Sequence, residues 1–136
     1  MKTIRTGLAA LILSVSHFAF AADPLAGALE LVSAKYSKPN GELIDEISGG
    51  KIKSLKILSK NRFTFITKAK DGKFISAGGG KYRIDGNKYV ESVDYASEAR
   101  MLGKDYVFSW QHANGDWLHK GMEDGVRIEE VWRRVK

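Results

Sequence analysis

Hydrophobic and polar residues alternate in short runs from Leu29 to the end of the chain, and turn-forming residues separate these runs. Alternation with a period of two is typical of strands that bury one face. Residues 38–50 are predicted to form a long loop, and residues 96–104 a connection with one or two helical turns. Asp-Gly and Asn-Gly pairs favour tight hairpins, so such turns are predicted at 70–73, 85–87, 113–116 and 123–126. The pattern predicts eight strands, near residues 28–36, 51–58, 62–69, 73–84, 88–95, 105–112, 116–122 and 126–135.

The turns also predict which side chains share a face, because a two-residue turn fixes the register of its hairpin. A turn at Asp71-Gly72 places Phe74 opposite Ala69, Ser76 opposite Thr67, Gly78 opposite Phe65 and Gly80 opposite Phe63. The same face continues through Tyr82, Ile84, Tyr89, Glu91, Val93 and Tyr95. The opposite face collects Lys68, Lys73, Lys81, Arg83, Lys88 and Asp94. This separation predicts a half-buried antiparallel sheet.

The last three predicted strands behave in the same way. Turns at 114–115 and 124–125 place Trp117 opposite Trp132, and His119 between Trp110 and Glu130. The inner face then holds Tyr106, Phe108, Trp110, His112, Trp117, His119, Ile128, Glu130, Trp132 and Arg134. The three glycines at 78–80 suit a sharp bend where a sheet closes on itself. We therefore predict an all-β fold, a single antiparallel up-and-down β-barrel of about eight strands with one short helical turn.

The N-terminus has the three regions of a secretory signal: Lys2 and Arg5, an apolar run from Leu8 to Val15, and the small residues around Ala21. Cleavage is expected between Ala21 and Ala22, which leaves residues 22–136 as one domain in the periplasm or outside the cell. That domain has 20 basic and 16 acidic residues, a net charge of +4, dispersed along the strands. No cysteine is present, so disulfides and a lipid-modified cysteine are excluded. Neither a basic stripe nor a nucleic-acid-binding motif is found, and we expect a monomer without a membrane span.

Three segments resemble a known family. Residues 25–33, the stretch from Gly80-Lys81-Tyr82 to Tyr89-Val90-Glu91, and residues 128–134 are similar to bacterial exported lipocalin-like proteins of uncharacterised function. The resemblance implies a calycin-type barrel whose mouth or interior can hold a small apolar molecule. Such proteins usually begin with Gly-x-Trp, and here Leu29 stands at the tryptophan position. In the lipocalin pattern that tryptophan packs under an arginine of the last strand, a role that would fall to Arg134.

Several polar groups on the predicted inner face could carry chemistry. Glu91 could accept phenolic hydrogen bonds from Tyr82 and Tyr89, as a ligand anchor or as a structural network. His119 opposite Glu130 has the form of a general-base pair, although the sequence offers no nucleophile beside it, so a structural pair is the favoured interpretation. A metal site of His112, His119 and Glu130 lacks the ligand spacing that zinc favours. Gly78-Gly79-Gly80 lacks the context of a phosphate loop. Lys51, Lys53, Lys56 and Lys60 are predicted to lie on a solvated outer face or an edge strand, and only occasionally would such a run dock an anion.

These observations predict a non-enzymatic binding protein for a small apolar or amphipathic molecule, without a catalytic residue, metal or cofactor. Two alternatives remain open, a structural or protein-interaction module that uses its outer surface or the 38–50 loop, and a hydrolase-type enzyme that uses His119 and Glu130. The predicted ligand-binding residues are Phe63, Phe65, Tyr82, Tyr89, Glu91, Trp110, Trp117, His119, Glu130, Trp132 and Arg134.

Overall fold

The computed structural model describes residues 25–48 and 50–136. The predicted signal segment, residues 1–21, lies outside this range. Nine strands and one 3-10 turn make up the fold: β1 (Gly27–Ser37), β2 (Leu43–Ile47), β3 (Ile52–Ser59), β4 (Arg62–Ala69), β5 (Phe74–Asp85), β6 (Lys88–Ala96), η1 (Ala99–Met101), β7 (Asp105–Ala113), β8 (Asp116–Glu123) and β9 (Val126–Arg134). The described residues contain no helix that is long and apolar enough to cross a membrane.

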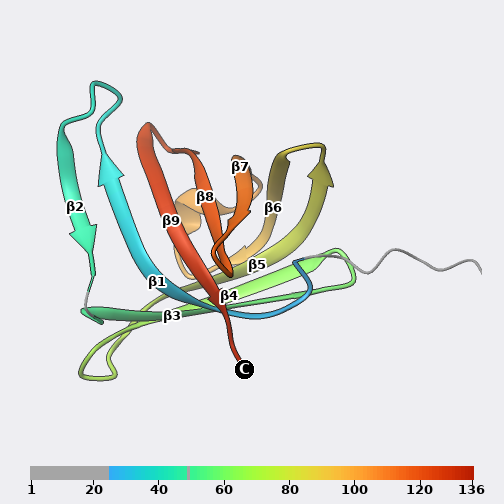
Figure 1. Ribbon diagram of the computed structural model, residues 1–136, viewed down its shortest axis with the longest axis horizontal. Helices are drawn as coiled ribbons and strands as arrows, with labels where there is room; N and C mark the ends of the chain where they lie inside the picture. Colours follow the sequence, from blue (N-terminus) through green and yellow to red (C-terminus); the bar gives the residue numbers. More distant parts are fainter. Residues whose placement is uncertain (1–24, 49) are drawn as a thin grey trace, which may run out of the picture.

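The strands close into an antiparallel up-and-down barrel. Consecutive strands pair with each other from β3 through β9, and β3 also pairs with β1. The pairing of β1 with β9 closes a ring of eight strands, β1 and β3 to β9. Strand β2 lies outside this ring and pairs with the second half of β1 (Figure 1). The predicted fold class is therefore confirmed, with one strand more than the pattern indicated.

Strand β2 falls within the predicted 38–50 loop. Its sequence Leu43-Ile44-Asp45-Glu46-Ile47 does not alternate, and its first four residues are exposed. This segment forms a strand because it pairs with β1. It has no buried face of its own, so no alternation marked it in the sequence. The short helical turn predicted between residues 96 and 104 is confirmed as η1.

Most predicted registers are confirmed. Phe63 pairs with Gly80, Phe65 with Gly78, Trp117 with Trp132, and His119 with both Trp110 and Glu130. A Cβ atom at Gly78 would lie 2.7 Å from the ring of Phe65, so the glycine is needed for this ring to enter the barrel. The Trp110 and Trp117 rings lie 4.9 Å apart and the Tyr82 and Tyr89 rings 5.6 Å apart, as side chains on shared faces require.

Two β-bulges overturn the predicted inward positions of Phe74 and Tyr95. The register shifts between Thr67 and Lys68, which pairs Phe74 with Lys68 in place of Ala69. A second shift, between Gly79 and Gly80, turns Tyr95 outward. Phe74 is 59% exposed and Tyr95 72% exposed, because an extra residue in one strand moves every later side chain to the other face. Ile84, His112 and Arg134 lie on the predicted face, opposite Tyr89, Trp117 and Leu29, but they sit at the end of the barrel and are exposed.

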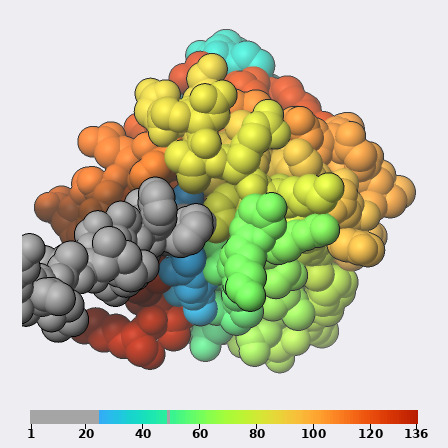
Figure 2. All heavy atoms as spheres, turned by 90° about the vertical axis from the view of Figure 1, so that its right-hand side faces the viewer, coloured from blue at the N-terminus to red at the C-terminus, as the bar shows by residue number. Residues whose placement is uncertain are grey.

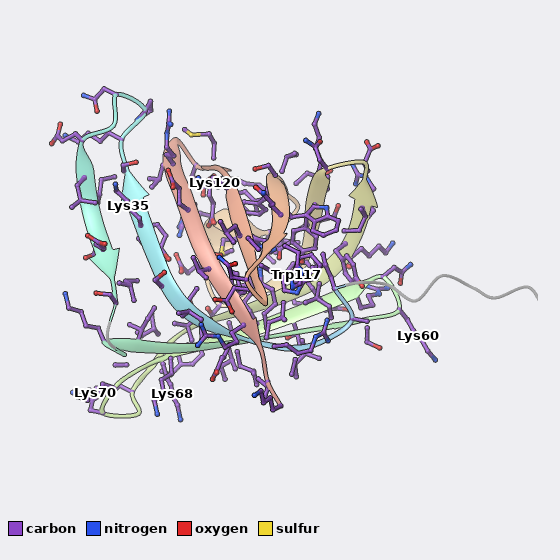
Figure 3. The ribbon with its side chains drawn as sticks, viewed as in Figure 1. Lys35, Lys60, Lys68, Lys70, Trp117 and Lys120 are labelled. Carbon is purple, nitrogen blue, oxygen red and sulfur yellow. The ribbon has the colours of Figure 1, made fainter. Side chains whose placement is uncertain are left out.

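The prediction for the lysine-rich strand is wrong at one position. Lys51, Lys53 and Lys60 are exposed as expected, but Lys56 is 5% exposed and points into the barrel. The exposed lysines Lys60, Lys68 and Lys70 extend away from the ribbon in Figure 3, whereas Trp117 lies inside it.

The barrel interior has two halves. The closed half lies near the β3–β4, β5–β6 and β7–β8 turns, and Leu25, Leu29, Leu58, Phe63, Tyr82, Tyr89, Trp117 and His119 fill it. In Figure 2, which faces this end, the β3–β4 and β5–β6 hairpins lie against each other. The open half lies toward the β1–β2, β4–β5 and β8–β9 turns and η1, and it is hollow.

Candidate functional site

The open half encloses a cavity of about 610 Å³. Short side chains create much of this space, because Ser54, Thr67 and Ser76 occupy neighbouring inward positions on β3, β4 and β5. The Ser54 and Thr67 hydroxyls bond each other at 2.8 Å. Leu31, Phe65, Met101, Phe108, Ile128 and Trp132 supply apolar wall. This volume lies within the range found for small-molecule pockets in other proteins.

A buried ion pair separates the cavity from the closed half. Lys56 Nζ lies 2.6 Å from Glu91 Oε1, and the Tyr89 hydroxyl donates to the same oxygen at 2.7 Å. Both charged side chains are less than a tenth exposed. The predicted Tyr89–Glu91 hydrogen bond is therefore confirmed, and the cation that compensates Glu91 is Lys56, which the sequence analysis had placed outside.

Aromatic rings surround the Lys56 ammonium. It lies 4.9 Å from the ring centroid of Trp132, 5.6 Å from that of Tyr89 and 6.0 Å from that of Phe63. Burial acts to lower the pKa of Lys56, but the charges of Glu91 and Glu130 outweigh it, and the pKa is raised overall. The amine stays protonated at neutral pH, so it is a fixed positive charge and a poor nucleophile.

Glu130 is another carboxylate on the cavity wall, and it feels the charge of Lys56. Its Oε2 accepts a hydrogen bond of 2.8 Å from the Trp132 indole, and the phenol of Tyr36 faces it from β1. Burial raises the pKa of Glu130, while Lys56 and the Trp132 hydrogen bond partly offset this. Burial and the charge of Glu130 in turn raise the pKa of the Tyr36 phenol. Glu130 therefore keeps its proton to a higher pH than an exposed carboxyl would, and the Tyr36 phenol stays neutral at physiological pH.

Glu123, the last residue of β8, lies nearer the mouth. Burial, followed by the negative charge of Glu130, raises the pKa of Glu123 to about 7, against an opposing effect of Arg100. Arg100 Nη1 is 3.9 Å from Glu123 but 2.6 Å from Asp124, which also binds Lys104. The exposed rim is thus crosslinked by ion pairs, while Glu123 behind it is weakly compensated.

His119 lies in the closed half and does not form the predicted pair with Glu130. Its ring is 1% exposed and packs 5.0 Å from Tyr89 and 6.0 Å from Phe108. Its Nε2 has no hydrogen-bond partner among the described residues. Burial, then the charge of Lys56, hold the pKa of His119 well below its usual value, so the ring is neutral. Within residues 25–48 and 50–136, no group of three or more His, Asp or Glu side chains is arranged to hold a metal ion.

The structure places the predicted ligand-binding residues in two groups. Phe65, Glu91, Glu130 and Trp132 line the cavity. Phe63, Tyr82, Tyr89, Trp117 and His119 are buried in the closed half, and Trp110 is half-buried. Arg134 is exposed, and its guanidinium donates to the carbonyl of Ala26 at the closed end. Ligand contact remains a prediction for the first group, and the second group shapes the barrel beneath the cavity.

Sequence reasoning missed Lys56, Glu123, Tyr36 and Ser54, and although it placed Thr67 and Ser76 on the inner face, it did not identify the space that these short side chains leave. A signal for Lys56 existed in the β3–β4 turn, where Lys60 and Asn61 both have positive φ and form a two-residue turn. Carrying the Phe63 face through that turn would have placed Lys56 opposite Phe65 on the inner face. Alternation along β8 from Trp117 and His119 would also have placed Glu123 on the inner face. No comparable signal marked Tyr36, because β1 shifts register between Leu31 and Ser33.

Comparisons with known proteins agree with this architecture. A family described as a domain of unknown function, DUF4488, matches residues 24–136. The chain belongs to this family. No curated protein matches it.

Two solved structures share the fold. A lipocalin-like protein from Bacteroides uniformis is 16% identical with a TM-score of 0.54, covering 82% of this chain and 98% of its own. An uncharacterized protein from Bacteroides eggerthii is 14% identical with a TM-score of 0.52, covering 81% of this chain and 98% of its own. Together with the closed barrel, these similarities establish that this DUF4488 chain has a lipocalin-like fold.

Proposed function

We propose that this DUF4488 barrel binds a small amphipathic molecule in its open half and does no chemistry on it. One observation carries the proposal: the interior is packed in one half and hollow in the other. A barrel that served only as a scaffold would gain stability by filling the hollow with apolar side chains, because burying apolar surface stabilises a fold. The wall combines apolar side chains with a few converging polar groups, as ligand sites do.

The placement of the candidate catalytic groups supports a binding role over catalysis. Lys56 is held protonated by Glu91, and His119 is sealed in the closed half. The acceptor oxygen of Glu130 is engaged by Trp132 and not by an imidazole. A binding role accounts for these groups without requiring a nucleophile.

We further propose that the protein acts as a monomer in the periplasm or outside the cell, after cleavage between Ala21 and Ala22. The charged and apolar regions of the N-terminal sequence support this. The mass of the protein recovered from a periplasmic fraction tests both the cleavage site and the compartment. A mass that retains residues 1–21 in the cytoplasmic fraction would contradict it.

Native mass spectrometry of protein purified from its own compartment tests the binding role. We expect a co-purifying small molecule that leaves on denaturation. Tryptophan fluorescence supplies a second measurement, because Trp132 lines the cavity whereas Trp117 lies beneath it. Ligand-dependent quenching should be largely lost in Trp132→Phe and retained in Trp117→Phe. Absence of a bound mass together with no response to any amphiphile would favour the filled-scaffold alternative.

A further inference from the structure

The cavity wall is acidic although the protein is basic. Two basic residues line the cavity, Lys56 and Arg100, against six acidic ones: Asp45, Glu91, Glu98, Glu123, Asp124 and Glu130. The whole sequence has the opposite balance, 22 Lys and Arg against 16 Asp and Glu. Charges that line a partly enclosed, low-dielectric space act strongly on a guest molecule. The cavity therefore selects by charge as well as by shape.

Two of the wall carboxylates are poorly compensated within the described part of the chain. Lys56 pairs with Glu91, and Arg100 lies 2.8 Å from Glu98 and 2.6 Å from Asp124. Glu123 has a long contact of 3.9 Å to Arg100. Glu130 accepts from two neutral donors, the Trp132 indole and the Tyr36 phenol, while the nearby Lys56 amine is hydrogen-bonded to Glu91 and only partly offsets the burial of Glu130. A carboxylate with a neutral donor and little solvent stabilises a cation that approaches it.

Lys56 demonstrates how the interior holds a positive group. Its ammonium binds one carboxylate and lies over the Trp132 ring, an arrangement that combines an ion pair with a cation–π contact. Glu130, which is bonded to the same Trp132, offers a second carboxylate to the cavity side. The protein thus has one internal cation in place and carboxylates left for another.

We propose that the ligand is a cationic amphiphile, whose positively charged nitrogen lies between Glu123 and Glu130 while its apolar tail packs on Leu31, Phe65 and Phe108. This inference rests on the proposed function, since it names the chemical class of ligand for the same cavity. An anionic head group would face both carboxylates, and the ammonium of Lys56 is already paired. A neutral head group would do nothing to offset the cost of ionising the two buried carboxyl groups.

Three ligands with the same tail test the charge preference. Isothermal titration at neutral pH, below micelle-forming concentrations, would compare dodecylammonium, dodecanol and dodecanoate on the mature protein. We expect dodecylammonium to bind about tenfold more tightly than dodecanol, and dodecanoate to bind most weakly.

Isosteric variants locate the preference. Glu130→Gln and Glu123→Gln should each weaken dodecylammonium binding about tenfold and change dodecanol binding less than about twofold. Glu129→Gln is the matched control, because this substitution removes the same charge from the neighbouring position of β9. The Glu129 side chain points outward and pairs with Lys120 at 3.4 Å. Near-ultraviolet circular dichroism checks that each variant keeps its fold.

The possible outcomes separate the two proposals. Equal binding of the three ligands, or binding unaffected by both glutamine variants, would overturn the cationic class and leave the cavity as a general amphiphile site. Tightest binding of dodecanoate would also overturn it and would implicate Lys56 as an anion anchor. Failure of all three ligands to bind would count against the cavity as a binding site, and the cationic class would fall with it.

Discussion

The same strands build both halves of the barrel interior, but one half is packed and the other is hollow. In the closed half, β3 and β4 direct Leu58 and Phe63 inward, and the rings of Tyr82, Tyr89 and Trp117 complete the packing. A few residues along the same strands, the inward side chains are Ser54 and Thr67. Side-chain size, at constant backbone geometry, therefore decides where this barrel is packed and where it is hollow.

The two halves also differ in how well their buried carboxylates are compensated. Glu91 in the boundary layer has both a cation and a phenol as partners. Glu123 and Glu130 in the open half are raised in pKa by burial and are weakly compensated. Substitutions should thus cost stability in the closed half and at the boundary, but affect ligand binding in the open half.

The largest expected effect comes from breaking the boundary ion pair. Lys56→Met should lower the free energy of unfolding by about 3–5 kcal/mol at neutral pH, because it leaves Glu91 buried without a cation. Urea denaturation measures this. Lys53→Met, an exposed lysine on the same strand, is the matched control and should change stability by less than about 0.5 kcal/mol. The double variant Lys56→Met, Glu91→Met should recover much of the loss. An equal loss in both single lysine variants would contradict this account.

Changes of side-chain size should have opposite consequences in the two halves. Leu58→Ala, which opens a void in the closed half, should cost about 2–5 kcal/mol of unfolding free energy. Ser76→Leu fills part of the cavity and should cost less than about 1 kcal/mol, while weakening amphiphile binding more than about tenfold. Denaturation and titration of both variants check the contrast. Strong destabilisation by Ser76→Leu would show that the open half is already packed.

Acid should act on the closed half through His119. Burial holds the pKa of the folded-state ring well below the unfolded value of about 6.5, so the unfolded chain binds the proton more readily. Stability should therefore fall as pH falls below about 6.5, by about 1.4 kcal/mol per pH unit for this one group. His119→Gln should remove that contribution in urea titrations between about pH 5 and 7. His112→Gln, at an exposed histidine, should keep the wild-type slope.

The smallest effect, of opposite sign, is expected at Glu123. Its folded-state pKa of about 7 lies above the unfolded value, so its contribution to stability is present in acid and declines as pH rises toward 7. Glu123→Gln mimics the protonated acid and should stabilise the protein by about 1 kcal/mol near pH 8, with no change near pH 4. The expected gain in stability is kept small because the Glu123 side chain is 21% exposed and solvent screens its charge. No gain at alkaline pH would mean that Glu123 is better compensated than its neighbours indicate.

Part of the site could be predicted from the sequence. The shared faces of Trp110 with Trp117 and of Tyr82 with Tyr89 followed from two-residue turns, which fix register over short distances. The inward position of Glu91 and its bond to Tyr89 followed from the same reasoning. Lys56 did not, because a lysine is seldom buried and its partner lies 35 residues away.

The sequence by itself determined the strands, most of the turns and the inward faces, because β pleating and turn chemistry act within a few residues. Tertiary structure alone decided the two bulges that expose Phe74 and Tyr95 and the pairing of β2 with β1. It also decided that the aromatic residues fill one half of the barrel and leave the other hollow. Each of these depends on contacts between strands that are far apart in the sequence. The alternation of residues within one strand does not encode such contacts.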